Sequence, residues 1–432
     1  MKKIKSYLLP VLLCLILVSI MSACKNSDTV LSKDETSPDD VNNTESSIQV
    51  DNQNVQISEW DKAETTGQSI VLTENGEKTN YIFDETDGDI YGFETKTNYE
   101  LTEKNAIMSG DATFIISDVK SENKTDGYEY VLHENGYVEI TYCNLNQKNI
   151  EIPSSLDGHP VGYIGENAFI YAKPERVIIP EGVMAISKNA FGTTLKSVAL
   201  PESLIVLGDY AFYSCGLLEK IEFKSGLQII GESCFSRCNS LKEVVIPSNV
   251  KVLGRDAFAY CQNLSSIKLN ESLKRMGSGC FSETIIAEIT VPEGIYQMNA
   301  GVFDNCTKLK KVTMPKTVGD AENGFGWAMF RGCSNLEEVN LPENIRLIWS
   351  ETFDGCTSLK SLTIPASVEE IEANNFNNCL SLKDIYFESA DCVINPINGF
   401  ELHPGLTVHA PKGGSVEQFF KMRPLVKFEA TD

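Results

Sequence analysis

The sequence predicts a repeat solenoid, in which short coils of similar sequence stack and share one apolar core. Three features predict it: a phenylalanine that recurs at a nearly constant interval, apolar positions that keep their spacing around it, and a proline after a short strand pattern. The ten recurring phenylalanines are 21 to 27 residues apart and are Phe169, Phe191, Phe212, Phe235, Phe258, Phe281, Phe303, Phe330, Phe353 and Phe376.

Each copy begins with a pattern that is typical of a short strand. Apolar residues alternate at Val244 and Ile246, and Pro247 then ends the strand because proline has no backbone N–H to donate. Beyond the proline an apolar residue recurs every three or four positions, which favours a coil or a short helical turn around a narrow core. A glycine follows where we expect a tight bend, at Gly165, Gly208, Gly231, Gly254 and Gly277.

A single copy is too small to bury its own apolar stripe, so neighbouring copies must cover one another. Paired strands lie about 4.8 Å apart, and about ten coils would therefore form a parallel sheet on the order of 45 Å long.

The repeat resembles that of the BspA-like leucine-rich-repeat family of bacterial and protist surface proteins, over roughly residues 126 to 430. The resemblance is carried by Ile-Pro, Ile-Gly and Ala-Phe pairs, at Ile152-Pro153, Ile179-Pro180, Ile246-Pro247, Ile364-Pro365, Ile164-Gly165, Ile230-Gly231, Ala168-Phe169, Ala190-Phe191, Ala211-Phe212 and Ala257-Phe258. It implies about ten coils with a parallel β-sheet face, a cap at each end, and contacts with host proteins, other cells or polymers. We expect locally weaker turns where the pattern is broken, at Lys224, Asn270 and Glu388 for proline and at Asn299, Trp349 and Glu372 for glycine.

Residues 1–23 have the features of a signal peptide. Three lysines precede an apolar run of about 15 residues, which is shorter than the roughly 18 to 20 residues of a membrane-spanning helix. The run ends in Met21-Ser22-Ala23-Cys24, which resembles the bacterial lipobox although Met21 replaces the usual leucine. The resemblance implies lipid attachment at Cys24 and membrane anchoring at the bacterial cell surface. Ordinary secretion and an uncleaved anchor are the alternatives.

Two further segments precede the repeats. Residues 24–54 are rich in Ser, Thr, Asp and Asn, so we expect a lipidated cysteine on a flexible stalk. Residues 55–122 contain strand-like runs, and we predict a small β-rich module there, with loosely ordered chain as the alternative. The runs are 69–72, 79–83, 90–93 and 112–116, and a turn is expected at Glu74-Asn75-Gly76.

A cap is expected at each end of the stack, because an open end would expose strand edges and apolar surface. Strand-like runs on both sides of Asn135-Gly136 predict a β-hairpin that forms the N-terminal cap, residues 126–149. The leucine-rich repeats then occupy residues 150–390. Residues 391–432 are the predicted C-terminal cap, with an amphipathic stretch from Ser415 to Met422.

The chain is strongly acidic. It has 37 Lys and Arg against 60 Asp and Glu, a net charge of -23, and removal of the three lysines in residues 1–23 would give -23 - 3 = -26. Binding to a phosphate backbone needs clustered basic residues, so we exclude nucleic acid as a partner.

Seven of the 13 cysteines share one position, three residues after the repeat phenylalanine. They are Cys215, Cys238, Cys261, Cys306, Cys333, Cys356 and Cys379, and Cys234 and Cys280 stand just before a phenylalanine. We predict that these thiols pack in an inward-facing column as small buried hydrophobic side chains. Disulfide bonds, which an exported chain can form, and a metal site at Cys234 and Cys238 are the alternatives.

No motif predicts catalysis. The four histidines, His133, His159, His403 and His409, lie in predicted caps or turns, where we expect polar surface side chains. None belongs to a His-Glu-x-x-His motif, and no nucleophile elbow or phosphate-binding loop is present. We therefore predict a protein without enzymatic activity or cofactor, and an active site would remain conceivable only in residues 55–122.

One candidate ligand-binding surface follows the position just after the repeat leucine, on the exposed sheet face. That position is occupied by Lys196, Glu219, Lys242, Ser265, Ala287, Lys310, Glu337, Lys360 and Lys383. Frequent lysine in an acidic chain favours an acidic protein or a glycan as ligand. The alternative is that these charges keep the sheet face soluble and protect its edges.

A second candidate is the long copy, in which 15 positions separate Pro315 from Phe330 against the usual 11. Four additional residues must protrude, and the segment contains Phe325 and Trp327. Aromatic side chains on a protruding loop are typical of a contact site. The alternative is that one of them folds back over the core.

These features predict a cell-surface binding protein that recognises a protein or glycan ligand in adhesion to host or neighbouring cells. The alternative is a carbohydrate-binding or envelope-organising lipoprotein that serves its own cell.

Overall fold

The structure is a computed structural model. It describes residues 68–74, 77–83, 106–109, 112–115, 119–125, 127–295, 297–318, 326–400, 403 and 405–431. The predicted signal peptide, Cys24 and the stalk lie outside the described residues. Within the described ranges no helix is long and apolar enough to cross a bilayer.

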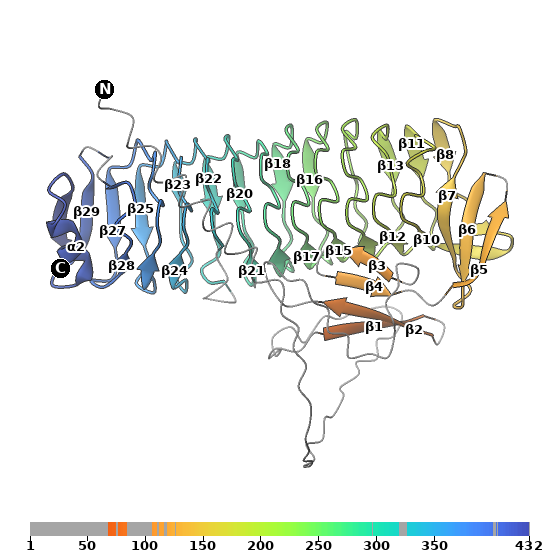
Figure 1. The fold of residues 1–432 in the computed structure, drawn as a ribbon, viewed down its shortest axis with the longest axis horizontal. Helices are drawn as coiled ribbons and strands as arrows, with labels where there is room; N and C mark the ends of the chain where they lie inside the picture. The colour runs from red at the N-terminus through yellow and green to blue at the C-terminus, as the bar shows by residue number, and fades with distance from the viewer. Residues whose placement is uncertain are drawn as a thin grey trace, which may run out of the picture. The chain divides into compact units, whose positions relative to one another are not determined.

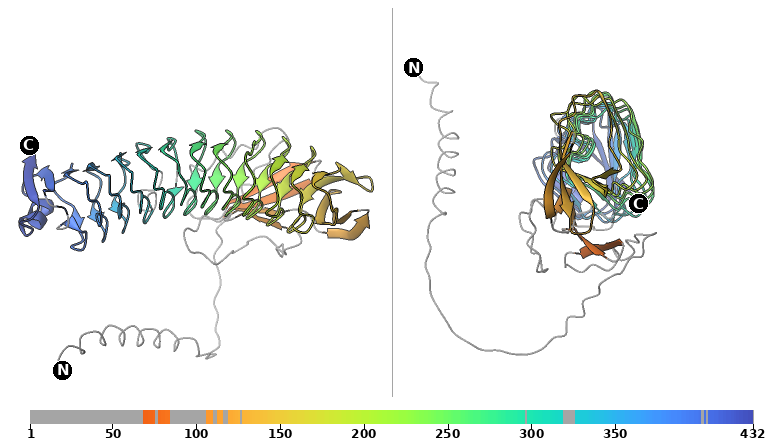
Figure 2. Two further views of the ribbon diagram at one scale, coloured as in Figure 1. Left: turned by 90° about the horizontal axis from the view of Figure 1, so that it is seen from above. Right: turned by 90° about the vertical axis from the view of Figure 1, so that its right-hand side faces the viewer.

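The repeats form a solenoid of about 12 coils, most of which contribute strands to two parallel files (Figures 1 and 2). The first strand file contains β8 (Asn149–Glu151), β11 (Arg176–Ile178), β13 (Ser197–Ala199), β16 (Glu243–Val245), β18 (Ser266–Lys268), β20 (Glu288–Thr290), β22 (Lys311–Thr313), β23 (Glu338–Val339), β25 (Ser361–Ile364), β27 (Asp384–Phe387), β29 (Thr407–Pro411) and β30 (Lys427–Thr431). The second strand file contains β10 (His159–Ile164), β12 (Ala185–Ile186), β14 (Val206–Leu207), β15 (Ile229–Ile230), β17 (Val252–Leu253), β19 (Arg275–Met276), β21 (Gln297–Met298), β24 (Leu347–Ile348), β26 (Glu370–Ile371) and β28 (Val393–Ile394).

The first file corresponds to the parallel sheet that the sequence predicts, although its strands are divided among four separate parallel sheets. In β16 the central Val244 is buried between the exposed Glu243 and Val245, as period-two alternation requires. The second file was not predicted, because most of its strands have only two residues, too few to show alternation. Turns complete most of the described coils, which agrees with the first of the two predicted alternatives, a coil, and not with a helical turn.

The phenylalanines form one column of stacked rings through the core. Adjacent ring centroids from Phe169 to Phe376 lie 5.2 to 6.0 Å apart, which confirms the predicted file. Phe400 adds an eleventh ring, 5.0 Å from Phe376. The repeat therefore continues into residues 391–432, which the sequence assigned to a cap alone, because Phe400 follows an irregular stretch that hid the pattern.

The cysteines lie in the predicted inward-facing column, and all eleven described thiols are free and buried. Most of the repeat cysteines also donate a hydrogen bond to the phenylalanine carbonyl of the preceding coil, as Cys261 does to Phe235 over 3.1 Å and Cys333 does to Phe303 over 3.0 Å. These bonds connect adjacent coils inside the core. His403 occupies the same position in its coil, and its Nε2 lies 2.6 Å from the carbonyl of Phe376.

The repeat glycines serve close approach between coils rather than the tight bend that we expected. A Cβ on Gly254 would lie 2.5 Å from the carbonyl carbon of Gly231, and one on Gly277 would lie 2.4 Å from the amide nitrogen of Arg255. Neither glycine has a positive φ angle. Positive φ angles occur instead two residues before each repeat phenylalanine, for example at Tyr210 (φ 57) and Glu351 (φ 62).

The departures from the repeat have local consequences. No strand forms in residues 218–224, where Lys224 replaces proline. Asn270, another replacement, instead donates side-chain hydrogen bonds to the carbonyls of Pro247 (2.7 Å) and Val250 (3.0 Å). Between β21 and β24, the second-file residues of the coil that contains the insertion lie outside the described residues.

The predicted N-terminal hairpin forms from β6 (Tyr128–His133) and β7 (Val138–Cys143), which pair antiparallel. β7 also pairs in parallel with β10, so the hairpin joins the second strand file. On its other side β6 pairs with β5 (Val119–Thr125), a strand that the sequence did not predict. The short β9 (Ser155–Leu156) pairs with β10.

The module preceding the solenoid contains a four-stranded antiparallel sheet in the order β1-β2-β4-β3. Its strands are β1 (Gln68–Glu74), β2 (Glu77–Phe83), β3 (Ala106–Ser109) and β4 (Ala112–Ile115). Three of the predicted runs are thus strands, and the predicted turn at residues 74–76 falls between β1 and β2. β3 was not predicted, and the predicted run at 90–93 lies outside the described residues.

The amphipathic stretch near the C-terminus is the helix α2 (Ser415–Lys421), which buries Val416 and Phe420. Phe420 packs against Phe400, with ring centroids 5.1 Å apart. The helix therefore covers the last ring of the phenylalanine column.

Candidate functional site

The residues just after the repeat leucines, which we call the lysine column, lie in line on the sheet face and are exposed. Backbone bonds align consecutive members, as from the amide of Glu337 to the carbonyl of Lys310 over 2.9 Å and from Lys383 to Lys360 over 2.8 Å. Lys242, Lys310, Lys360 and Lys383 are all exposed at the start of first-file strands.

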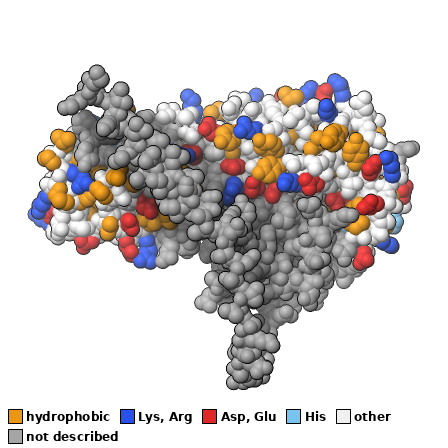
Figure 3. All heavy atoms as spheres, viewed as in Figure 1, with side chains coloured by type: hydrophobic (Ala, Val, Ile, Leu, Met, Phe, Trp, Pro, Cys, Tyr) orange, Lys and Arg blue, Asp and Glu red, His pale blue; other side chains and the backbone are white. Residues whose placement is uncertain are grey.

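The column contains paired acidic and basic side chains and is not a purely basic stripe. Lys360 pairs with Glu337 over 2.7 Å, and Glu175 pairs with Lys148 at 2.8 Å and Lys196 at 2.7 Å. The hydrogen bonds from both lysines lower the pKa of Glu175 to about 2. Lys148 and Glu175 belong to the same column, which the sequence analysis began two coils too late, at Lys196. Figure 3 likewise shows basic and acidic side chains intermixed on the visible face of the coils.

The second candidate surface contained Phe325 and Trp327, of which the structure describes Trp327 alone, because Phe325 lies outside the described residues. Gly326 occupies the repeat-glycine position, because its added Cβ would lie 2.6 Å from the amide nitrogen of Ala300. Trp327 therefore belongs to the regular coil just after the insertion, and not to the protruding residues themselves. Its neighbours in the equivalent position are the small residues Ala300 and Ser350, and its side chain is 40% exposed.

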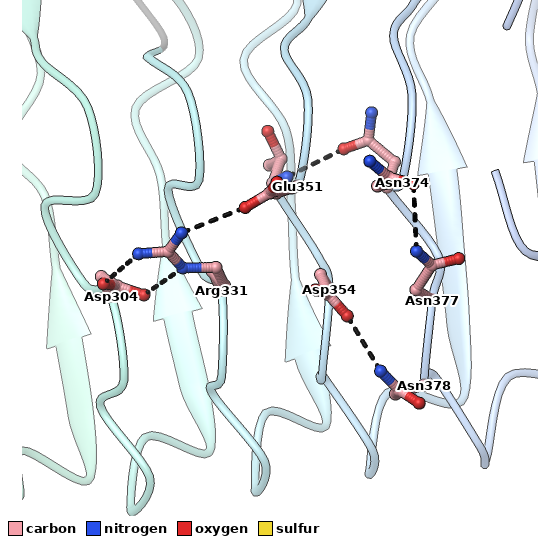
Figure 4. Close-up of polar contacts among 9 residues, drawn as sticks. Asp304, Arg331, Glu351, Asp354, Asn374, Asn377 and Asn378 are labelled. Atoms are coloured by element: carbon pink, nitrogen blue, oxygen red, sulfur yellow. Dashed lines mark hydrogen bonds and ion pairs between the residues drawn. The ribbon is translucent and has the colours of Figure 1, made fainter. Parts of the chain in front are cut away.

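Arg331 connects Trp327 to two carboxylates on the adjacent coils. Its guanidinium carbon lies 4.9 Å from the indole ring centroid. It donates two bonds to Asp304, at 2.8 and 2.9 Å, and one to Glu351 at 3.0 Å. We call Trp327, Arg331, Asp304 and Glu351 the Trp327 cluster; Figure 4 shows its three charged members on three successive coils.

The ion pairs hold the cluster in one arrangement. Hydrogen bonds to Asp304 and Glu351 raise the pKa of Arg331 above its usual value, so the guanidinium stays charged. A bidentate Arg–carboxylate pair fixes the plane of the guanidinium, which in turn stacks on the indole. A ligand would therefore meet an aromatic surface whose orientation is already set.

Amide side chains continue the polar surface beside the cluster (Figure 4). Asn378 donates to Asp354 over 3.2 Å, and Asn377 donates to Asn374 over 3.2 Å. Counting Arg331 against Asp304, Glu351 and Asp354, this surface has a net negative charge.

Other exposed aromatic side chains flank the phenylalanine column in earlier coils. Tyr260 is exposed and lies under Arg237, whose guanidinium carbon is 4.7 Å from the ring centroid. This pair resembles the pair of Trp327 and Arg331. The sequence analysis missed both pairs. Arg237 and Tyr260 are 23 residues apart and meet because adjacent coils stack, whereas Trp327 and Arg331 are four residues apart within one coil, where the turn brings them together.

The histidines do not all lie on the surface as expected. His133 and His403 are buried, and burial lowers the pKa of His403. His133 Nε2 lies 3.0 Å from Glu139, and His409 Nε2 lies 2.9 Å from Asp384. Among the described residues, no group of three or more His, Cys, Asp or Glu side chains could hold a metal ion.

Burial makes the repeat thiols poor nucleophiles. It raises the pKa of Cys215, Cys261 and Cys379 to about 12, and it raises the pKa of Cys234 and Cys356 well above the usual value. Since the thiolate is the reactive form, these cysteines have a packing role.

Comparisons with known proteins agree with the repeat. The family model of the BspA type leucine rich repeat region matches six copies, over residues 139–226, 162–285, 230–325 and 323–401. A comparison with curated proteins gives no match.

Solved structures of three bacterial proteins are similar to this chain. A leucine rich cell surface protein from Faecalibacterium prausnitzii is 22% identical, with 73% of this chain and 96% of that chain covered and a TM-score of 0.39. A leucine-rich repeat protein from Bacteroides ovatus is 24% identical, with coverages of 74% and 100% and a TM-score of 0.40. The T. pallidum leucine rich repeat protein is 29% identical, with coverages of 50% and 92% and a TM-score of 0.40. The family model matches well over half of the chain, and the chain therefore belongs to the BspA-type leucine-rich-repeat family.

Proposed function

We propose that this protein is a cell-surface binding protein whose solenoid recognises a protein ligand in adhesion, and that the Trp327 cluster is the main contact. The observation that carries the proposal is an exposed tryptophan stacked on an arginine that two carboxylates hold in place. Tryptophan and arginine are enriched among the residues that dominate binding energy at protein interfaces.

Preorganisation supports this choice over the lysine column. Ordering a side chain on binding costs about 0.5 to 1.5 kcal/mol, and the guanidinium of Arg331 is already ordered by three hydrogen bonds. Exposed ion pairs such as Lys360–Glu337 contribute little and are screened by salt. The excess of carboxylates around Trp327 favours a ligand that presents a basic residue beside an apolar one.

The test measures binding of the full chain to immobilised extracellular matrix proteins and to a glycan array, followed by substitution of the cluster. Trp327→Ala should weaken binding to a protein ligand by about 2 kcal/mol, roughly 30-fold in Kd, as expected for a residue at the centre of an interface. Arg331→Ala should weaken it comparably, because it removes the stacking partner.

Tyr260→Ala is the matched control, since it removes an exposed aromatic ring stacked on an arginine elsewhere in the solenoid. Equal losses for Tyr260→Ala and Trp327→Ala would show that the Trp327 cluster is not the contact. Binding to glycans alone would contradict protein recognition and favour the carbohydrate-binding alternative.

A further inference from the structure

The second strand file has a column of buried side chains on its outer side, and five of its seven members are apolar. Inside the solenoid Ile186, Leu207 and Ile230 belong to the core, and the residue that precedes each one lies on the opposite side of the sheet. We call the set of Cα partners on that side the outer column. Its members, in register from β10 to β21, are Tyr163, Ala185, Val206, Ile229, Val252, Arg275 and Gln297.

The burial of the outer column does not come from the core of the solenoid. Val206 and Ile229 are 0% and 2% exposed, although neither belongs to the continuous core. Val393 stands at the equivalent position of β28 in the same file and is 63% exposed. Val245, on the outer side of the first file, is 62% exposed. Residues at this position of the coil are therefore not buried in every coil. The outer column is buried only in the coils from β10 to β21.

A sheet that buries apolar side chains on both sides needs a second layer on its outer side. The four-stranded sheet β1–β4 is a suitable layer. Its register places Ile70, Tyr81, Phe114 and Ile107 in one row across all four strands. A single small sheet with such a row is not stable alone and must cover that face against another element.

The connection between the two sheets favours this pairing. β4 ends at Ile115 and β5 begins at Val119, so three residues separate them. An extended chain spans about 3.3 to 3.6 Å per residue, which limits the connection to roughly 10 to 14 Å. β5 belongs to the same sheet as the outer column, through β6, β7 and β10. The module is thus tethered at the edge of that sheet at high effective concentration.

We propose that the apolar row of β1–β4 docks on the apolar part of the outer column, from β10 to β17, and covers this side of the solenoid as an intramolecular second layer. The covered side is then unavailable to an external ligand. Recognition is left to the first strand file, to the turns around the phenylalanine column and to the distal coils beyond the insertion.

The test uses the full chain and follows tryptic cleavage after Lys78, which lies inside β2. Ile229→Asp places a charge in the outer column and should release the module, raising the cleavage rate at least tenfold. Val245→Asp places the same charge on the exposed outer side of the first file and should leave the rate unchanged. Equal rates for the two variants would overturn the proposal.

A reciprocal pair keeps the test valid if Ile229→Asp does not fold. Phe114→Asp should release the module and increase binding of the apolar dye ANS to the uncovered column. Thr113→Asp, which lies on the other face of β4, should do neither. Sedimentation of the wild-type chain should give a monomer. A dimer that Ile229→Asp dissociates, with no change in cleavage after Lys78, would show that a second copy covers the column and would also overturn the proposal.

Discussion

At the scale of single residues, the glycines show how close the coils lie to one another. Gly254 meets the backbone of the preceding coil, and not a flexible side chain, where its Cβ would be. Backbone in a stacked coil cannot move aside without lengthening the hydrogen bonds of the strands beside it. The position therefore excludes any side chain for a steric reason.

Gly254→Ala should destabilise the solenoid by about 1 to 3 kcal/mol, because the added methyl group overpacks a contact with backbone. Denaturant titration measures the change in the free energy of unfolding. Gly216→Ala is the control, since a Cβ there would meet its nearest neighbours at 3.9 Å. A similar loss in both variants would show that the cost does not come from the close approach between coils.

At the scale of the element, each coil is connected to the next by several aligned contacts. Phenylalanine rings stack, thiols donate to phenylalanine carbonyls, and short strands pair in register, all at the same step along the solenoid. Because a coil contacts only its neighbours, its stability comes from these interfaces and not from its own interior.

The thiol column makes stability sensitive to alkaline pH. Burial raises the pKa of Cys215, Cys261, Cys306, Cys379 and Cys392 to about 12, above the value of about 8.5 to 9 in an unfolded chain. The stability contribution is complete below the unfolded pKa. It is lost as the pH rises toward the folded pKa, because only the unfolded chain releases protons in that window.

The free energy of unfolding should fall between about pH 9 and pH 12, by up to about 1.4 kcal/mol per pH unit for each thiol. Denaturant titrations under reducing conditions at several pH values measure this slope. Cys261→Ser retains a donor for the carbonyl of Phe235 but does not titrate in this range, so its slope should be smaller by one thiol. An unchanged slope would show that the thiols do not titrate on unfolding.

At the scale of the whole molecule, three parts have separate roles in the proposals above. The solenoid presents the Trp327 cluster, the β1–β4 module covers one side of the second strand file, and the segment before them is predicted to anchor the chain. The anchor rests on the motif at residues 21–24 alone.

Cys24→Ser should abolish incorporation of labelled fatty acid into the protein in its own cell, because the serine cannot form the thioether that holds the lipid. Cys14→Ser changes another cysteine of the same N-terminal region and should keep normal labelling. Labelling that persists in Cys24→Ser would exclude this residue as the attachment site.

The sequence by itself determined the solenoid, the columns of phenylalanine and cysteine, the strand before each proline, and the N-terminal hairpin. These features depend on side chains that recur at a fixed spacing. They could be predicted because stacked coils bring equivalent positions of neighbouring repeats into contact. The sequence also indicated Trp327 as a candidate contact residue, because it lies in the one copy that is longer than the others.

Only the tertiary structure decided the rest. The strands of the second file have too few residues to be recognised from the sequence. The glycines are required because the backbone of the neighbouring coil lies close to them. Arg331 forms an ion pair with Asp304, which is 27 positions away in the sequence. Five of the seven members of the outer column are apolar, but only the register of separate coils aligns them on one side of a sheet. Such features depend on contacts between distant residues, which a local pattern does not encode.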